Sequence, residues 1–216
     1  MEEEQTTRPR PRIESLSDLV FGLALSIGAI ALVSNPPTTT AGFYRDVATF
    51  GFNFVVLISI WLRYTRIVSA LPLETRGTMA LNSVLLFTVS LEPFLFNIIR
   101  SGNSAKPAAV QLFETASSLY GVDLGIMMLI MAVFTLALAD EEKRLVPRGL
   151  LRQLREESVT WFVSSGIFLV SALPLFGRID VGGVFVSGLS IRTVLWLSAI
   201  AVAWLRARHG RRQPED

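Results

Sequence analysis

The stretch Arg12-Ile13-Glu14-Ser15-Leu16-Ser17-Asp18 runs directly into an apolar segment at residues 19–33. Ionisable groups are costly in lipid, so a carboxylate at the entrance of a membrane helix should face protein or water. In one reading, Asp18 complements the helix dipole while Ser15 caps the first turn. In a second, compatible reading, Ser17 and Asp18 join a buried hydrogen-bond network with polar groups of the second and third helices.

The composition indicates an all-α membrane protein. Hydrophobic residues make up 51% of the 216 residues and charged residues 18%, which is below the roughly one quarter of charged residues in soluble domains. The length suits about six helices, since each span needs about 20 residues plus a connection. A cleaved signal peptide is not favoured, because the first apolar block contains Asp18, is long, and is followed by Asn35-Pro36-Pro37.

Three regions are expected along the chain. Residues 1–11 form a cytoplasmic tail, residues 12–206 a six-helix transmembrane domain, and residues 207–216 a basic cytoplasmic tail. Apolar blocks and the prolines and glycines that end them predict helices at residues 13–34, 46–68, 78–99, 108–139, 158–176 and 190–206. Residues 108–120 could instead be a separate interfacial helix. Residues 140–157 are predicted to be a charged connection, and residues 177–188 a turn or short strand-like excursion.

The distribution of positive charge supports this layout. With six spans and both termini on one side, most of the 20 Lys and Arg residues fall on that side. The opposite side holds only Arg45, Arg100, Lys106, Arg178 and Arg192. The positive-inside rule then predicts that both termini lie in the cytoplasm.

The first helix has two distinguishable faces. Small and polar residues recur at helical spacing on one face, which would let another helix approach closely: Asp18, Gly22, Ser26 and Ala29. An adjacent face carries Leu23, Ile27, Ile30 and Ser34. An aliphatic row of this kind usually faces lipid or core. Symmetric copies around an axis would instead make stacked hydrophobic rings, which can gate a pore by dewetting.

Polar residues in the other helices have ordinary explanations as well. Glu92 lies late in its helix and is expected to reach the outer interface, with attraction of cations as the alternative, and Asp123 is interpreted in the same way. Asn53 and Asn82 are expected to make interhelical hydrogen bonds. The second helix ends in an aromatic and basic set typical of a membrane interface: Trp61, Arg63, Tyr64 and Arg66.

Enzyme signatures are missing from the sequence. Cys is absent and His209 is the single His, which excludes thiolate nucleophiles and His-based triads or metal sites. There is no Gly-rich phosphate loop with its Lys, and no Thr-Val-Gly-Tyr-Gly potassium filter. The net charge of +2 gives no argument for nucleic acid. We expect no catalytic residue, no metal site and no cofactor.

Three motifs resemble a known family. The stretch at residues 12–18 resembles the R-x-x-x-F-S-D signature of the transmembrane protein 175 family of potassium channels, with Leu16 in place of Phe. Phe52-Asn53-Phe54 followed by Trp61 is similar to the second helix of that family, and residues 81–94 to its third helix. Two departures affect polar positions. Histidines common after the second-helix Trp are absent, and Ser26 stands where members carry Thr.

The resemblance implies a homotetrameric potassium channel in the cell membrane whose pore is lined by the first helix. The narrowest ring would be Leu23, with further rings at Ser26 or Ile27 and at Ile30. A structural network would position these rings: Arg12, Ser17, Asp18, Trp61 and Asn82. Potassium would pass as the permeant ion, and the partners would be further copies of the chain and the lipid bilayer.

Two other functions stay open at this point. Asp18 or Glu92 could serve a proton-coupled secondary transporter, although no internal repeat of the transporter kind is evident. Alternatively, the chain could be a non-conducting membrane scaffold whose first helix merely packs.

Overall fold

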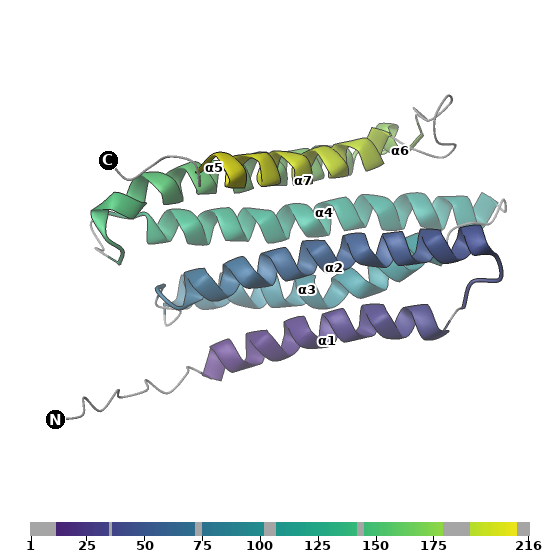
Figure 1. Cartoon of the computed structure of the whole chain (residues 1–216), viewed down its shortest axis with the longest axis horizontal. Coiled ribbons are helices and arrows are strands. Elements are labelled where there is room, and N and C mark those ends of the chain that lie inside the picture. The colour runs from purple at the N-terminus through teal and green to yellow at the C-terminus, as the bar shows by residue number, and fades with distance from the viewer. Residues whose placement is uncertain are drawn as a thin grey trace.

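The computed structural model describes residues 12–34, 36–71, 75–101, 107–141, 145–178 and 191–210. All regular secondary structure in these ranges is helical, and it comprises α1 (Arg12–Ser34), α2 (Thr40–Val68), α3 (Arg76–Ser101), α4 (Pro107–Leu138), α5 (Arg148–Ser171), α6 (Leu175–Arg178) and α7 (Ile191–Gly210). Each long helix runs antiparallel to the long helix before it, so α1 begins and α7 ends at the same end of the bundle (Figure 1).

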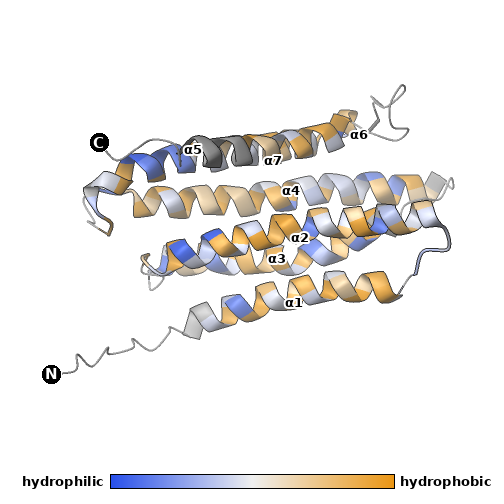
Figure 2. Ribbon diagram, viewed as in Figure 1, coloured by the Kyte–Doolittle hydropathy of each residue, from blue (hydrophilic) through white to orange (hydrophobic). Residues whose placement is uncertain are grey.

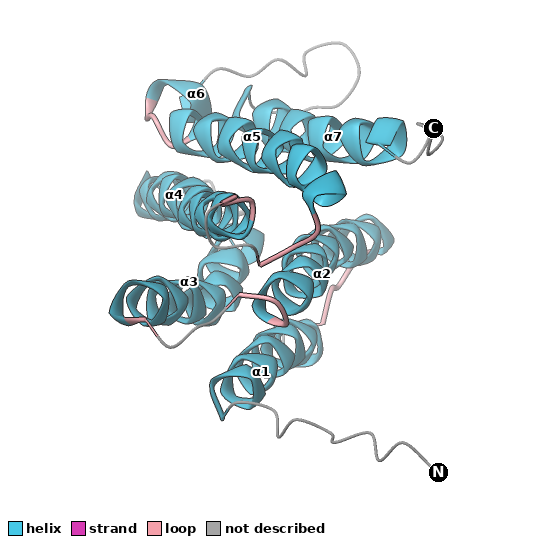
Figure 3. Ribbon diagram, turned by 90° about the vertical axis from the view of Figure 1, so that its left-hand side faces the viewer, coloured by secondary structure: helices cyan, strands magenta, loops and turns pink. Residues whose placement is uncertain are grey.

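The helices form an elongated bundle with α1 at one edge. Seen end-on, α2 and α3 lie next to α1, α4 follows, and α5 and α7 form the opposite edge (Figure 3). The main packing partners of α4 are α3 and α5, whereas α1 packs on α3 and α2. Helix α1 is therefore covered on one side by the bundle, and its other side is uncovered in a single subunit.

The centre of the bundle is α4, whose residues are apolar on nearly every side. Leu124, Met127, Met131 and Phe134 are completely buried. A helix that is hydrophobic all round belongs in the interior, and unbranched Met side chains fill irregular gaps between neighbouring helices. The close packing of α4 provides the frame on which the outer helices are placed.

Among the residues that the structure describes, four helices are long and apolar enough to cross a membrane: Ser15–Ser34, Thr40–Val68, Arg76–Ile99 and Ala108–Leu138. A shorter apolar helix covers Ile191–Val202. The hydropathy colouring of Figure 2 shows the apolar character of α1 and α4 and the polar start of α5. The prediction of an all-α, multi-pass membrane protein is confirmed at this level.

The predicted boundaries of the first helix are close to those observed, and those of the second are not. Helix α1 begins at Arg12, so Ser15 stands inside the helix and not at its N-cap. Helix α2 begins at Thr40 and not at residue 46. The physical reason is Thr39, whose hydroxyl accepts a hydrogen bond of 3.1 Å from the Gly42 N–H and caps the helix.

The predicted charged connection at residues 140–157 is wrong for its second half, because α5 begins at Arg148. The charged residues there lie on a helix surface, where Arg152 pairs with Glu156 one turn later. The helix ends at Ser171, not at residue 176. Helix α4 is continuous, so residues 108–120 belong to it and not to a separate interfacial helix. Residues 179–190, which hold most of the predicted Gly-rich excursion, lie outside the described residues.

A glycine sets the close approach of α4 and α5. A Cβ at Gly125 would lie 2.7 Å from both Cγ and Cδ2 of Leu169. The Gly125 carbonyl also accepts a hydrogen bond of 2.8 Å from the Ser165 hydroxyl of α5. Small residues at such contacts let helix backbones approach closely in membranes.

Gly125→Ala should force the two helices apart and lower the free energy of unfolding by about 1–3 kcal/mol, the usual cost of overpacking. Gly166→Ala on α5 is the matched control, because a Cβ there meets no atom within 4 Å; it should be neutral or slightly stabilising. Thermal unfolding in detergent measures both. Equal melting temperatures for the two variants would contradict the close contact.

Candidate functional site

An apolar row runs along the uncovered side of α1. Leu23 is 57% exposed and Ile30 61% exposed, and four further exposed side chains continue the row: Leu16, Leu19, Ile27 and Val33. Residues three and four apart share one face of a helix. The reverse face of α1 is buried against the bundle and includes Ser17, Phe21 and Ala24.

Ser26 also lies on the uncovered side of α1. Its hydroxyl donates a hydrogen bond of 2.8 Å to the Gly22 carbonyl one turn earlier. Because the single hydroxyl hydrogen is used in that bond, Ser26 presents an acceptor oxygen to its surroundings. The four residues that the sequence singles out on this helix, Leu23, Ser26, Ile27 and Ile30, are therefore all uncovered in the single subunit.

The covered side of α1 is tied to α2 and α3 by a chain of hydrogen bonds. The Ser17 hydroxyl lies 2.7 Å from the Tyr64 hydroxyl, which donates to Asn82 Oδ1 at 2.7 Å. Tyr64 has one hydroxyl hydrogen, so Ser17 must be the donor in the first bond. Next to this chain, the Trp61 indole N–H donates to Asp18 Oδ1 at 3.0 Å.

Four of the five residues of the predicted structural network lie in these contacts: Ser17, Asp18, Trp61 and Asn82. Arg12 is the first residue of α1, and its side chain lies outside the described part of the chain. Tyr64, which the sequence pattern predicted to lie at the membrane interface, links Ser17 to Asn82. That assignment is wrong, because Tyr64 is only 1% exposed. The available signal was its spacing of three from Trp61, which puts both side chains on one face.

A second polar cluster lies between α2, α3 and α4. Glu92 is completely buried and Asp123 is 3% exposed, so the expectation that Glu92 reaches the outer interface is wrong. The Tyr120 hydroxyl donates to Glu92 Oε1 at 3.1 Å. The side chain of Asn53, also buried, hydrogen bonds to the same carboxyl group.

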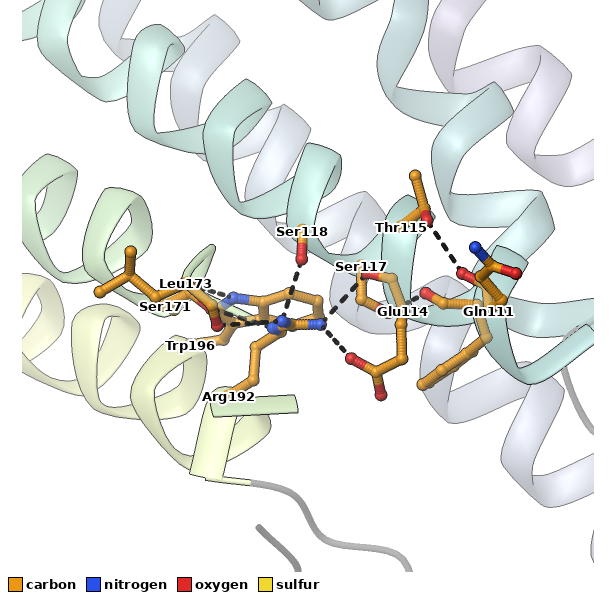
Figure 4. Close-up of polar contacts among 10 residues, drawn as sticks. Gln111, Glu114, Thr115, Ser117, Ser118, Ser171, Leu173, Arg192 and Trp196 are labelled. Carbon is orange, nitrogen blue, oxygen red and sulfur yellow. Dashed lines mark hydrogen bonds and ion pairs between the residues drawn. The ribbon is translucent and has the colours of Figure 1, made fainter. Parts of the chain in front are cut away.

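A third cluster surrounds Arg192 near the start of α7 (Figure 4). Its guanidinium group is almost fully buried and donates to the Ser171 carbonyl at 2.9 Å, the Ser118 hydroxyl at 3.0 Å, the Leu173 carbonyl at 3.3 Å and Glu114 Oε2 at 3.3 Å. The Ser171 carbonyl belongs to the last residue of α5, where no later turn of that helix can satisfy it. The Leu173 carbonyl lies two residues beyond α5 and also accepts from the Phe176 N–H. Arg192 thereby joins α4, α5 and α7 at one end of the bundle.

Within the described ranges, no group of three or more His, Cys, Asp or Glu side chains could hold a metal ion. The site therefore consists of an apolar row with the hydroxyls of Ser26 and Ser34 beside it. Buried polar contacts on the opposite side of α1 hold this helix in place. Such an arrangement can guide or restrict an ion by the width of a passage and by its hydration.

Comparisons with known proteins point to one family. Residues 12–93 match the sequence profile described as endosomal/lysosomal potassium channel TMEM175. The fold is similar to the crystal structure of a lysosomal potassium-selective channel TMEM175 homolog from Chamaesiphon minutus, with 17% identity, a TM-score of 0.57 and coverage of 90% of this chain and 96% of that one.

A variant of the potassium channel MtTMEM175, solved in complex with a nanobody–MBP fusion protein, is also similar in fold. It shares 16% identity at a TM-score of 0.57, and 96% of each chain is covered. A comparison with curated proteins gave no match.

Tyr64→Phe should remove the hydroxyl that connects Ser17 to Asn82, and with it the hydrogen bond to the buried Asn82 Oδ1. Leaving buried polar groups unsatisfied costs about 1–3 kcal/mol, so the melting temperature in detergent should fall. Tyr44→Phe is the control, because Tyr44 is exposed on α2 and should melt like the wild type. A wild-type melting temperature in Tyr64→Phe would show that the hydrogen bonds of Tyr64 do not stabilise the fold.

Proposed function

We propose that the chain, whose residues 12–93 match the endosomal/lysosomal potassium channel TMEM175 family, forms a potassium-conducting channel whose pore is lined by α1. The observation that carries this proposal is the uncovered row of α1, which stands opposite the buried polar contacts of the same helix. A helix that is fixed to its own subunit on one side can keep its opposite side turned toward an axis shared with other subunits.

The proposed assembly is a homotetramer. Four copies of α1 around the axis would stack aliphatic rings, with Leu23 at the narrowest point and further rings at Ser26 or Ile27 and at Ile30. An aliphatic ring supplies no oxygen ligands to a bare ion. Discrimination between potassium and sodium would then rest on pore width, partial hydration and the Ser26 hydroxyl oxygens, so we expect it to be modest.

Six membrane crossings complete the proposal. The antiparallel succession of α1 to α5 and α7 (Figure 1) supports an even number of crossings, with the shorter apolar parts of α5 and α7 supplying the last two. Arg63, Arg66 and Arg76 lie at the end of the bundle where α1 begins. By the positive-inside rule, that end and both termini would face the cytoplasm of a cell-membrane protein.

The structural network has a mechanical role in this proposal. Ser17, Asp18, Trp61 and Asn82 would hold α1 in one rotation about its own axis, because turning the helix would separate Ser17 and Asp18 from α2. The rings would then keep their register with one another. Arg12, one turn before the network, would act at the same end.

Purified protein in liposomes should let potassium through at channel rates and prefer it over sodium. Electrical recording separates the alternatives: a proton-coupled transporter would give slow coupled flux without unitary currents, and a scaffold would give no flux. A preference for sodium, or impermeability to both cations, would refute the potassium channel.

Leu23→Ala should widen the narrowest ring, raise the unitary potassium conductance and weaken discrimination against sodium. Leu197→Ala is the control, since Leu197 is a comparably exposed Leu on α7, at the edge of the bundle opposite α1 (Figure 3). Its currents should match the wild type in single-channel recording. Unchanged currents in Leu23→Ala would put this residue away from the ion path.

A further inference from the structure

The buried cluster of α2, α3 and α4 contains two acids that the pore proposal does not use. Glu92 belongs to α3 and Asp123 to α4, and Asn53 of α2 completes the cluster. Asn53 and Asp123 lie close to the middle of their helices, as the bounds Thr40–Val68 and Pro107–Leu138 indicate. All three side chains are at least nine-tenths buried.

Several buried acceptor atoms of this cluster have no hydrogen-bond partner. Tyr120 donates to Glu92 Oε1, and the Asn53 side chain also bonds to the Glu92 carboxyl. Glu92 Oε2, Asp123 Oδ2 and Asn53 Oδ1 are buried without a hydrogen-bond partner. Every one of these atoms is an acceptor when both acids are ionised, so the cluster lacks a donor.

The charges around the cluster do not compensate for two carboxylates. Glu92 and Asp123 lie near enough for their charges to interact, and the two carboxylates would have the same sign. On α2, Asp46 is a further acid, and Arg63 lies about 15 Å further along the helix than Asn53 and pairs with Glu157 of α5.

Two further charged groups of the neighbouring helices are engaged elsewhere. Arg192 of α7 is bound to Glu114 of α4 and to backbone carbonyls. Asp18 of α1 accepts from Trp61. If both acids were ionised, the cluster would thus hold two negative charges that no cation in the described part of the chain compensates, which an apolar interior strongly disfavours.

We propose that Glu92 and Asp123 form a proton-binding site inside each subunit, with Asn53 and Tyr120 as its hydrogen-bonding partners. A proton on Glu92 Oε2 or Asp123 Oδ2 removes one of the two buried charges. It also turns one surplus acceptor into the missing donor. Water supplies the proton and takes it back, so no other reactant is needed. The site depends on neither a pore nor a tetramer, and so extends beyond the proposed function.

A metal cation is the competing occupant, and the structure favours it less. A cation needs several oxygens gathered around a space of its own size, whereas a proton occupies one of the existing oxygens. Glu92 already accepts hydrogen bonds from Tyr120 and Asn53, which is the environment of a carboxyl group within a hydrogen-bond network.

The full-length protein in detergent provides the test, at constant potassium concentration. A proton held by the folded state and not by the unfolded state stabilises the folded state, so stability falls as pH rises. The wild-type melting temperature should fall from mildly acidic to mildly alkaline pH. The double variant Glu92→Gln with Asp123→Asn should lose that part of the slope, and the exposed control Glu156→Gln should keep it.

Two outcomes of the melting experiment would overturn the proposal. One is an equal pH slope in the wild type and the double variant. The other is a melting temperature that follows the concentration of sodium or potassium at fixed pH but does not respond to pH, which would assign the cluster to a metal cation.

Infrared spectroscopy of the wild type keeps the proposal testable if the double variant does not fold. A carbonyl band of a protonated carboxylic acid should be present at neutral pH and should lose intensity in Glu92→Gln or Asp123→Asn alone. A wild-type spectrum without this band would refute the site.

Discussion

The hydroxyl of Tyr64 is the contact on which the arrangement of the first three helices depends. It is buried among apolar side chains, where a polar group without a partner is costly, and it is satisfied by Ser17 on one side and Asn82 on the other. Because its one hydrogen goes to Asn82, the order of donors along the chain is determined. Any rotation of α1 would break it, so the side of α1 that faces outward follows from a contact on the side that faces inward.

The same constraint explains which features could be predicted from the sequence. The bounds of α1 and its exposed row followed from local signals: helical spacing of apolar residues and the Asn35-Pro36-Pro37 stop. Tyr64 could not be assigned in this way, because its partners lie 47 and 18 residues away. A Tyr beside two arginines at the end of an apolar helix has the same local pattern whether it meets lipid headgroups or two other helices.

Charge was the least reliable local signal. Charged residues after Asp140 suggested a connection, yet α5 begins at Arg148, and Arg152, Arg155 and Glu156 are exposed on the surface of this helix. Glu92 suggested an interface and is instead enclosed by three helices. The environment of Glu92 is provided by helices distant in sequence. The position of a charge along one helix therefore did not reveal whether water, lipid or protein surrounds it.

The contacts of Arg192 also limit the order in which the C-terminal helices can pack during synthesis. The carbonyl of Ser171, the last residue of α5, is bound by a side chain that stands 21 residues further along the chain, so the ribosome makes the donor only after the acceptor. During synthesis, the end of α5 must remain incomplete, or hydrated, until α7 follows it. The helices α4, α5 and α7 can therefore pack together only once Arg192 has been synthesised. The helices α1, α2 and α3 can pack together earlier, as soon as Asn82 of α3 has been synthesised.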